Sequence, residues 1–148
     1  MLRVVTSAVP HLWRQSGAVR LSTTGAHLLR DGDTATVKKV IKREDVAEYG
    51  ELVEDNNPVH EDIVHGTFLL GLVSGVMASR LPGPGTVLTS LSVKFIRPCR
   101  HPATVQVVVE VGRVRKITKT QFRVEDSDTQ EVLVRGEASC YLSPDQLQ

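Results

Sequence analysis

The first thirty positions of this 148-residue chain contain no Asp or Glu, although seventeen acidic residues follow. This leader instead carries arginines and hydroxyl-bearing side chains: Arg3, Arg14, Arg20, Arg30, Ser7, Ser16, Ser22, Thr23 and Thr24. A leader of this composition is typical of a mitochondrial transit peptide. We therefore expect residues 1–30 to direct the protein to the mitochondrial matrix and residues 31–148 to form one domain.

Strong positive charge and aromatic side chains are also scarce. The net charge is +1 and aromatics make up 4% of the chain, which argues against a nucleic-acid-binding surface or a base-stacking platform. The only cysteines are Cys99 and Cys140. A pair of cysteines in a chain of this size favours a reduced compartment, and we expect both thiols to be buried.

The chain lacks a long uninterrupted hydrophobic run. Residues 64–81 are mostly apolar, but polar side chains interrupt them, so a buried core helix fits better than a membrane span. The Gly-rich stretch at residues 82–85 has no lysine in the spacing of a phosphate-binding loop.

The hydrophobic periodicity predicts an α+β fold. A strand is expected at residues 34–41 and helices at residues 43–53 and about 64–81, the first ending before Asn57-Pro58. Alternating apolar residues predict four long strands, at residues 86–98, 103–116, 117–126 and 130–142. An antiparallel sheet wrapped around one central buried helix would accommodate this order.

Polar residues of one short turn suggest acid–base chemistry. Asp55, Asn57 and His60 surround Pro58, and Gly66 follows at the predicted start of the long helix. A carboxylate beside an imidazole can transfer protons, and a helix N-terminus can stabilise an oxyanion. Judged on these residues alone, a helix-terminating loop with incidental polar side chains remains the alternative.

Four segments together carry a family resemblance: Asp55-x-Asn57-Pro58-x-His60, Ile63-Val64-His65-Gly66, residues 81–85 and residues 92–98. Residues 34–142 resemble the (R)-specific enoyl-CoA hydratases, which are MaoC-like dehydratases of hot-dog fold. Within that family they look closest to the mitochondrial hydroxyacyl-thioester dehydratases of type 2. The resemblance implies a homodimer that acts on acyl thioesters of coenzyme A or acyl carrier protein without a cofactor or metal.

The same resemblance implies roles for individual residues. Asp55 and His60 would be the catalytic pair, and Asn57 would order the turn or the catalytic water. The backbone N–H of Gly66 would stabilise the oxyanion on the thioester. His65 is expected to be structural.

The chain departs from the family pattern at three places. Glu54 stands where the family has a glycine, which would strain Glu54 by about 1–2 kcal/mol if the backbone there has positive φ. Only Glu61 and Asp62 separate His60 from Ile63, about a dozen residues fewer than usual, or roughly three helical turns. Residues 99–103 replace a glycine-bearing turn, which should affect strand pairing more than chemistry.

We therefore expect dehydration of (3R)-hydroxyacyl thioesters, and the reverse hydration, in mitochondrial fatty acid synthesis. The alternative is a non-catalytic hot-dog subunit that binds acyl thioesters or a partner, because the short connection and Glu54 can damage the site. The Asp-x-Asn-Pro-x-His motif speaks against a thioesterase.

Two further sets of residues leave alternatives open. A metal site is not expected, because on a helix the five-residue step from His60 to His65 turns the second imidazole about 140° away. Four basic residues lie where the predicted strands at residues 103–116 and 117–126 meet: Arg113, Arg115, Lys116 and Lys119. They could bind a coenzyme A phosphate or an acidic carrier protein, or simply form a solvated face.

Overall fold

The computed structural model describes residues 28–147 and contains one five-stranded sheet. Its strands are β1 (Thr34–Ile41), β2 (Val87–Phe95), β3 (Ala103–Val111), β4 (Ile117–Asp126) and β5 (Val132–Tyr141). The spatial order is β1-β3-β4-β5-β2, and every neighbouring pair is antiparallel. Buried and exposed side chains alternate along most of β4, as the sequence pattern predicts for a half-buried sheet.

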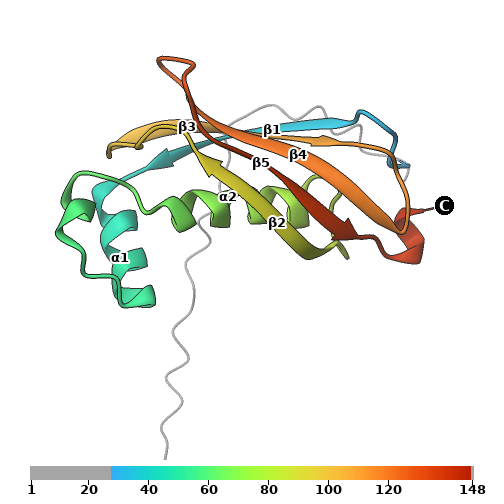
Figure 1. Cartoon of the computed structure of the whole chain (residues 1–148), viewed down its shortest axis with the longest axis horizontal. Helices are drawn as coiled ribbons and strands as arrows, with labels where there is room; N and C mark the ends of the chain where they lie inside the picture. The colour runs from blue at the N-terminus through green and yellow to red at the C-terminus, as the bar shows by residue number, and fades with distance from the viewer. Residues whose placement is uncertain (1–27, 148) are drawn as a thin grey trace, which may run out of the picture.

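Two α-helices lie on one side of this sheet (Figure 1). The long helix α2 (Gly66–Ser79) runs beneath the strands, and α1 (Arg43–Val53) lies with the short 3₁₀ helix η1 (Pro58–Glu61) at one end. A second 3₁₀ helix, η2 (Pro144–Gln146), follows β5. The predicted α+β hot-dog fold, with a sheet wrapped around a helix, is confirmed.

The hydrophobic core fills the space between α2 and the sheet. Leu69, Val73, Val76 and Met77 of α2 are buried, and they meet one face of the strands, including Val107, Val109, Phe122, Val124 and Val134. The prediction that α2 is buried on most sides is only partly right, because Gly71 and Ser74 on its other side are exposed. The described residues of one chain do not cover that side.

The edge strand β2 is the most exposed strand of the sheet. Eight of its nine residues are exposed, and β5 is its only neighbour among the described strands. Exposed apolar side chains on or beside β2 include Val87, Leu91, Phe95 and Ile96. A long apolar edge of this kind is a template for pairing with another strand.

Gly136 allows β5 to approach its neighbours closely. A Cβ atom at this position would collide with the carbonyl oxygen of Ser92 and lie 2.6 Å from the ring of Phe122. Because a backbone atom cannot move away as a side chain can, only glycine fits at this crossing of β2, β5 and the Phe122 ring.

Two predictions about the whole chain have different outcomes. Within residues 28–147, no helix is long and apolar enough to span a membrane. Of the transit peptide predicted for residues 1–30, residues 1–27 lie outside the described residues, and the transit peptide stays a prediction.

Candidate active site

The end of α1 places Asp55. Glu54 has φ 58° and ψ 32°, which is the left-handed conformation that ends many helices. The amide of Asp55 donates to the carbonyl of Gly50 at 2.9 Å, and the amide of Glu54 donates to the carbonyl of Glu51 at 3.3 Å. These two bonds form a Schellman motif, so Asp55 leaves the helix in a fixed direction.

Asn57 orders the turn that follows. Its backbone amide donates to Oδ1 of Asp55 at 3.1 Å, and its own Oδ1 accepts from the amide of Val59 at 3.2 Å. Asn57 is therefore the N-cap of η1, with Pro58 at the first helical position, where proline needs no amide hydrogen. The turn fixes one carboxylate oxygen of Asp55 and leaves the other free to face the histidines.

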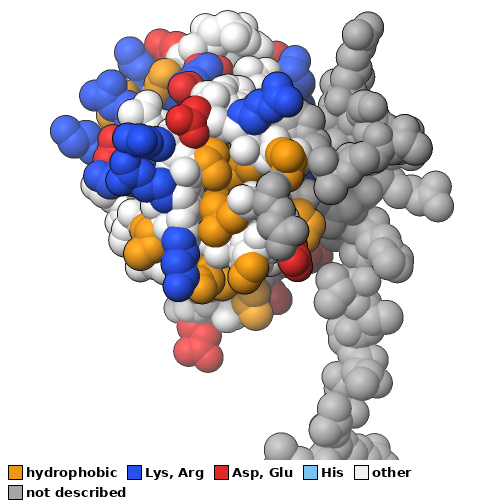
Figure 2. Space-filling view, turned by 90° about the vertical axis from the view of Figure 1, so that its right-hand side faces the viewer, with side chains coloured by type: hydrophobic (Ala, Val, Ile, Leu, Met, Phe, Trp, Pro, Cys, Tyr) orange, Lys and Arg blue, Asp and Glu red, His pale blue; other side chains and the backbone are white. Residues whose placement is uncertain are grey.

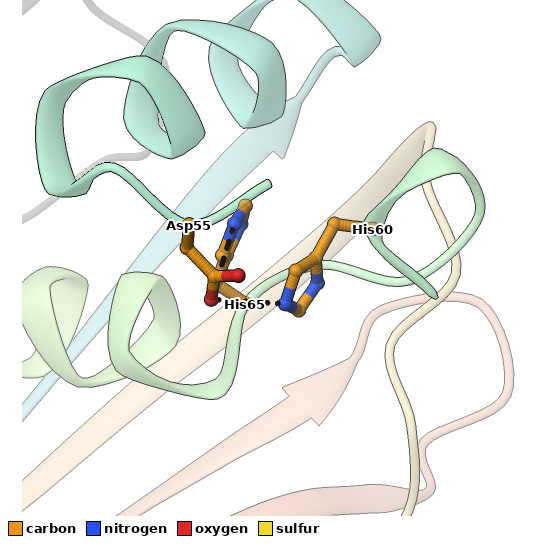
Figure 3. Close-up of side chains that lie close together, drawn as sticks. All are labelled: Asp55, His60 and His65. Carbon is orange, nitrogen blue, oxygen red and sulfur yellow. Dashed lines mark ion pairs between the residues drawn. The ribbon is translucent and has the colours of Figure 1, made fainter. Parts of the chain in front are cut away.

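His60, in η1, contacts Asp55 and forms a pair with it (Figure 3). Its Nε2 lies 3.3 Å from Oδ2 of Asp55, and its Nδ1 lies 2.9 Å from the carbonyl oxygen of Ile63. Because a carbonyl oxygen only accepts, Nδ1 must carry a hydrogen. Nε2 is therefore the ring nitrogen of His60 that faces Oδ2 of Asp55. The pair is partly open to solvent, with side-chain exposures of 18% for His60 and 42% for Asp55.

His65 lies behind this pair and is almost fully buried. Its ring stacks on that of His60 with centroids 3.6 Å apart, and its Nε2 lies 3.9 Å from Oδ2 of Asp55. Tyr49 meets the His65 ring edge-on, and its hydroxyl is 3.0 Å from the hydroxyl of Thr67, which ties α1 to α2. Burial, and next the charge of His60, lower the pKa of His65, so this imidazole is neutral at pH 7.

Residues 99–101 hold the short connection between His60 and α2. The amide of Val64 donates to the carbonyl of Cys99 at 2.8 Å, and Ile63 forms an isolated β-bridge with Arg100. His101 donates from its amide to the carbonyl of Asp62, and from Nε2 to the carbonyl of His60, both at 3.1 Å. We call residues 99–101 the strap. The expectation that this region affects strand pairing more than chemistry stays a prediction, since the strap both forms this β-bridge and contacts the backbone of His60.

Three potential metal ligands come together here, which the sequence did not predict. The donor atoms of Asp55, His60 and His65 all lie within 4.8 Å of one another. The helical argument against a metal does not apply, since His60 is in η1 and His65 is the N-cap of α2. The two rings are nearly parallel, 20° apart. Their in-plane lone pairs therefore run side by side and do not converge on one ion, and this geometry suits proton transfer better.

A cleft of about 550 Å³ opens on one side of the pair. We call it the front cleft, and its apolar lining consists of Ile63, Val64, Leu69, Phe95, Ile96 and Pro98. Gly66 also lines it, at the first position of α2, where backbone amides lack an intrahelical acceptor. A Cβ at Gly66 would lie 2.6 Å from the Phe95 ring, so glycine lets the start of α2 pack closely against this ring. An apolar chain and a developing negative charge can both be accommodated here.

A second cleft of about 470 Å³ opens on the other side of the same pair. We call it the back cleft. Asp55, His60 and His65 line it together with mainly polar residues of α1, of the turn between α1 and η1, of η1 and of the strap: Arg43, Glu51, Asn56, Asn57, Glu61 and His101. Asp55 and His60 therefore line both an apolar cleft and a polar one.

All four predicted site residues meet at this place. Asp55 and His60 are in contact, Asn57 orders their turn, and Gly66 lies in the same cleft as the pair. Sequence reasoning missed the proximity of His65 to Asp55 and the bond from His101 to His60. A signal for His65 was present, since it directly precedes the predicted oxyanion donor. No local signal pointed to His101, which is 41 residues from His60.

Neither cysteine is suited to be a nucleophile. Cys99 and Cys140 are both buried, as expected. Burial raises the pKa of Cys99 to about 11 and also raises the pKa of Cys140. Cys99 lines the front cleft, but at neutral pH it is a thiol and not a reactive thiolate.

The basic residues near β3 and β4 lie far from this site within one chain. Lys116 has its Nζ 5.4 Å from the ring centroid of Tyr141, and Tyr141 pairs with Val87 at the start of β2. Phe95, which lines the front cleft, is at the opposite end of β2, about 26 Å away at 3.3 Å per residue. Figure 2 looks onto the end of the molecule away from α1, where Lys and Arg side chains gather beside exposed hydrophobic ones.

Comparison with known proteins identifies the class and then the family. The solved structure of the (R)-hydratase from Aeromonas caviae involved in PHA biosynthesis superposes with a TM-score of 0.75 and 31% identity, covering 80% of this chain and all of that one. The R-hydratase PhaJ1 from Pseudomonas aeruginosa gives a TM-score of 0.73 and 27% identity, covering 77% and 82%. The fold is therefore that of the hot-dog hydratases. Residues 22–132 match the family model described as MaoC like domain, and the chain belongs to this family.

Characterised relatives agree with this assignment. A 3-hydroxybutyryl-CoA dehydratase from Methylorubrum extorquens is 34% identical over 123 residues, which cover 74% of this chain and 78% of the relative. An (R)-specific enoyl-CoA hydratase from Rhodospirillum rubrum is 33% identical over 124 residues, covering 75% and 86%.

Proposed function

We propose that this protein is a hydro-lyase that interconverts (3R)-hydroxyacyl thioesters and trans-2-enoyl thioesters. The observation that carries the proposal is the contact between Oδ2 of Asp55 and Nε2 of His60, in the lining of an apolar cleft that Gly66 also lines. The relatives named as hydratases and dehydratases support the reaction class and its stereochemistry.

The geometry suggests how water adds to the double bond. A water molecule bound by Asp55 and His60 gives up a proton to the pair while its oxygen bonds to C3 of the enoyl chain. Negative charge moves to the thioester oxygen, where the Gly66 amide at the positive end of α2 stabilises it. The pair then returns a proton to C2, so that water has added across the double bond. Dehydration follows the same steps in reverse.

We further propose that the reaction belongs to mitochondrial fatty acid synthesis, in the matrix. The support is the arginine-rich, acid-free leader at residues 1–30, which lies outside the described residues apart from its last three positions. Fusing residues 1–30 to a fluorescent protein tests this part by itself. Import into mitochondria is expected, and a diffuse signal would contradict it.

Acyl thioesters of coenzyme A or of acyl carrier protein are the proposed substrates, and a homodimer is the proposed assembly. The front cleft offers an apolar lining for an acyl chain. The exposed edge of β2 and the uncovered side of α2 offer a surface for a second copy.

The deciding experiment is hydration of a short trans-2-enoyl thioester by the purified full chain, with coenzyme A and with acyl carrier protein as carriers. A (3R)-hydroxy product is expected. Asp55→Asn and His60→Gln should each reduce turnover by about 10²–10⁴-fold, the usual contribution of a positioned acid or base. Asp62→Asn is the matched control, because Asp62 is exposed and lines neither cleft.

The outcome also decides the alternative of a non-catalytic subunit. Two observations favour that alternative: the short connection after His60 and the strained backbone at Glu54. A folded protein that binds acyl thioesters but turns over neither carrier form would establish it and refute the proposed enzyme.

A further inference from the structure

The two clefts meet at the same three side chains. Asp55, His60 and His65 line both the front cleft and the back cleft. Oδ1 of Asp55 is held by the Asn57 amide, and Nδ1 of His60 is held by the Ile63 carbonyl. Oδ2 of Asp55 and Nε2 of His60 are therefore the atoms left available to molecules in either cleft. These are also the atoms that exchange protons in the proposed reaction.

The linings of the clefts match two different reactants. The front cleft has apolar walls from β2, the residues after it and the start of α2, and it fits an acyl chain. Nine of the thirteen residues that line the back cleft are polar or charged, and a polar lining retains water. Hydration brings the enoyl thioester and water together at Asp55 and His60. An acyl chain that fills the front cleft excludes water from that cleft.

The connection after His60 is short and leaves the back cleft open. Only Glu61 and Asp62 separate His60 from Ile63. The strap holds this segment through backbone hydrogen bonds with Asp62 and with Val64, which follows Ile63. Glu61 of this connection lines the back cleft itself. The strap keeps the pair in place without covering it.

We propose that the back cleft is a second entrance to the active site, through which water and other small polar molecules reach Asp55 and His60 while an acyl thioester fills the front cleft. The role of this entrance during turnover rests on the proposed function. The existence of the entrance can be tested without turnover.

The first test closes the back cleft reversibly in the full-length protein. Ala47 is an exposed α1 residue that lines this cleft, so Ala47→Cys can be capped with a bulky methanethiosulfonate. Cys99 and Cys140 are buried with raised thiol pKa values and will not compete. Capping should lower kcat for hydration about tenfold while KM for the thioester stays unchanged, and dithiothreitol should restore kcat.

Glu48→Cys is the matched control, because Glu48 is an exposed residue of the same helix α1 that lines neither cleft. Capping Glu48→Cys should leave both kinetic constants unchanged. An unchanged kcat in capped Ala47→Cys would overturn the proposal. A rise in KM alone would also overturn it, since the cap would then be acting on thioester binding.

The second test measures access to His60 by diethyl pyrocarbonate, with the modified histidine located by peptide fragmentation. Ile96 is an exposed residue of the front cleft, so capped Ile96→Cys closes that side. Capping either side alone should leave His60 reactive, and only the double variant capped on both sides should be protected. Full protection by the front cap alone would show that there is no second entrance. If His60 is reachable from both sides but no thioester turns over, the entrance stands and the proposed function fails.

Discussion

At the scale of single residues, the Asp55 carboxylate has two different environments. Its Oδ1 accepts from the backbone amide two residues later, in a local Asx turn that Asp forms with any following residue that has a backbone N–H at that position. Its Oδ2 faces His60 and His65, which arrive from different elements. Half of the arrangement at this carboxylate is therefore local, and half depends on how α1, η1 and α2 pack.

The lowered pKa of His65 predicts that the free energy of unfolding depends on pH. Because burial, and next the charge of His60, lower its pKa in the folded protein below 6.5, the unfolded chain binds a proton here at a pH where the folded protein does not. The free energy of unfolding should therefore fall as the pH drops below about 6.5. His65→Gln removes this titration, so its stability should change less over the range from about pH 7.5 to pH 5. Urea unfolding at several pH values measures both proteins, and equal slopes would contradict the assignment.

At the scale of elements, the end of α1 determines where the acid is placed. Glu54 adopts a left-handed conformation that costs a residue with a Cβ about 1–2 kcal/mol. The Schellman bonds at Gly50 and Glu51 hold it there. The sequence predicted the strain conditionally, and the positive φ of 58° confirms it.

Glu54→Gly should raise the free energy of unfolding by about 1 kcal/mol, because glycine adopts this conformation without a steric penalty. Glu54→Ala is the matched comparison. It removes the same charge but keeps the Cβ, so it should not be stabilised. Denaturant unfolding of the two variants distinguishes relief of strain from loss of charge, and equal gains would show that charge is the cause.

The strap is the second element-scale feature, and His101 is its residue that reaches His60. His101→Phe keeps the ring volume but lacks the donor to the His60 carbonyl. We expect kcat to fall about tenfold with KM nearly unchanged, since only the placement of His60 changes. His101→Gln can still donate and should retain most of the activity. Equal losses in both variants would mean that His101 contributes packing only.

At the scale of the whole molecule, one chain leaves an apolar surface uncovered. Both β2 and one side of α2 are exposed, and the end of β2 forms part of the front cleft. A second copy of the chain pairing at β2 would cover this surface and border the site. The predicted homodimer is therefore best tested at the middle of β2.

Sedimentation equilibrium should give the mass of two chains. Leu91 lies near the centre of β2 and is 39% exposed, and a charge at that position opposes edge pairing, so Leu91→Asp should give one chain. Val40→Asp is the control, because Val40 is an exposed apolar residue on β1, at the other edge of the sheet. It should remain a dimer. A wild-type protein that sediments as one chain would contradict the prediction.

Much of this organisation could be predicted because it depends on local patterns. Alternation in β4, the apolar run of α2 and the Asn57-Pro58 helix stop are properties of neighbouring residues, and they predicted the elements to within a few positions. The extent of β3 was overestimated, since the alternation continues to residue 116 while the strand ends at Val111. Exposure on one side of α2 was missed because composition does not show which side of a helix the sheet covers.

The fold class, the turn that presents Asp55 and the residue types available for acid–base chemistry can be predicted from the sequence, because each follows from short-range periodicity, capping and side-chain chemistry. Tertiary packing stacks His65 on His60, brings His101 to the backbone of His60 and places the pair in the lining of two clefts. These relations join residues that are far apart in the chain or lie on different elements. Their distances are set by the packing of α1, η1, α2 and the strap against one another, which no local pattern specifies.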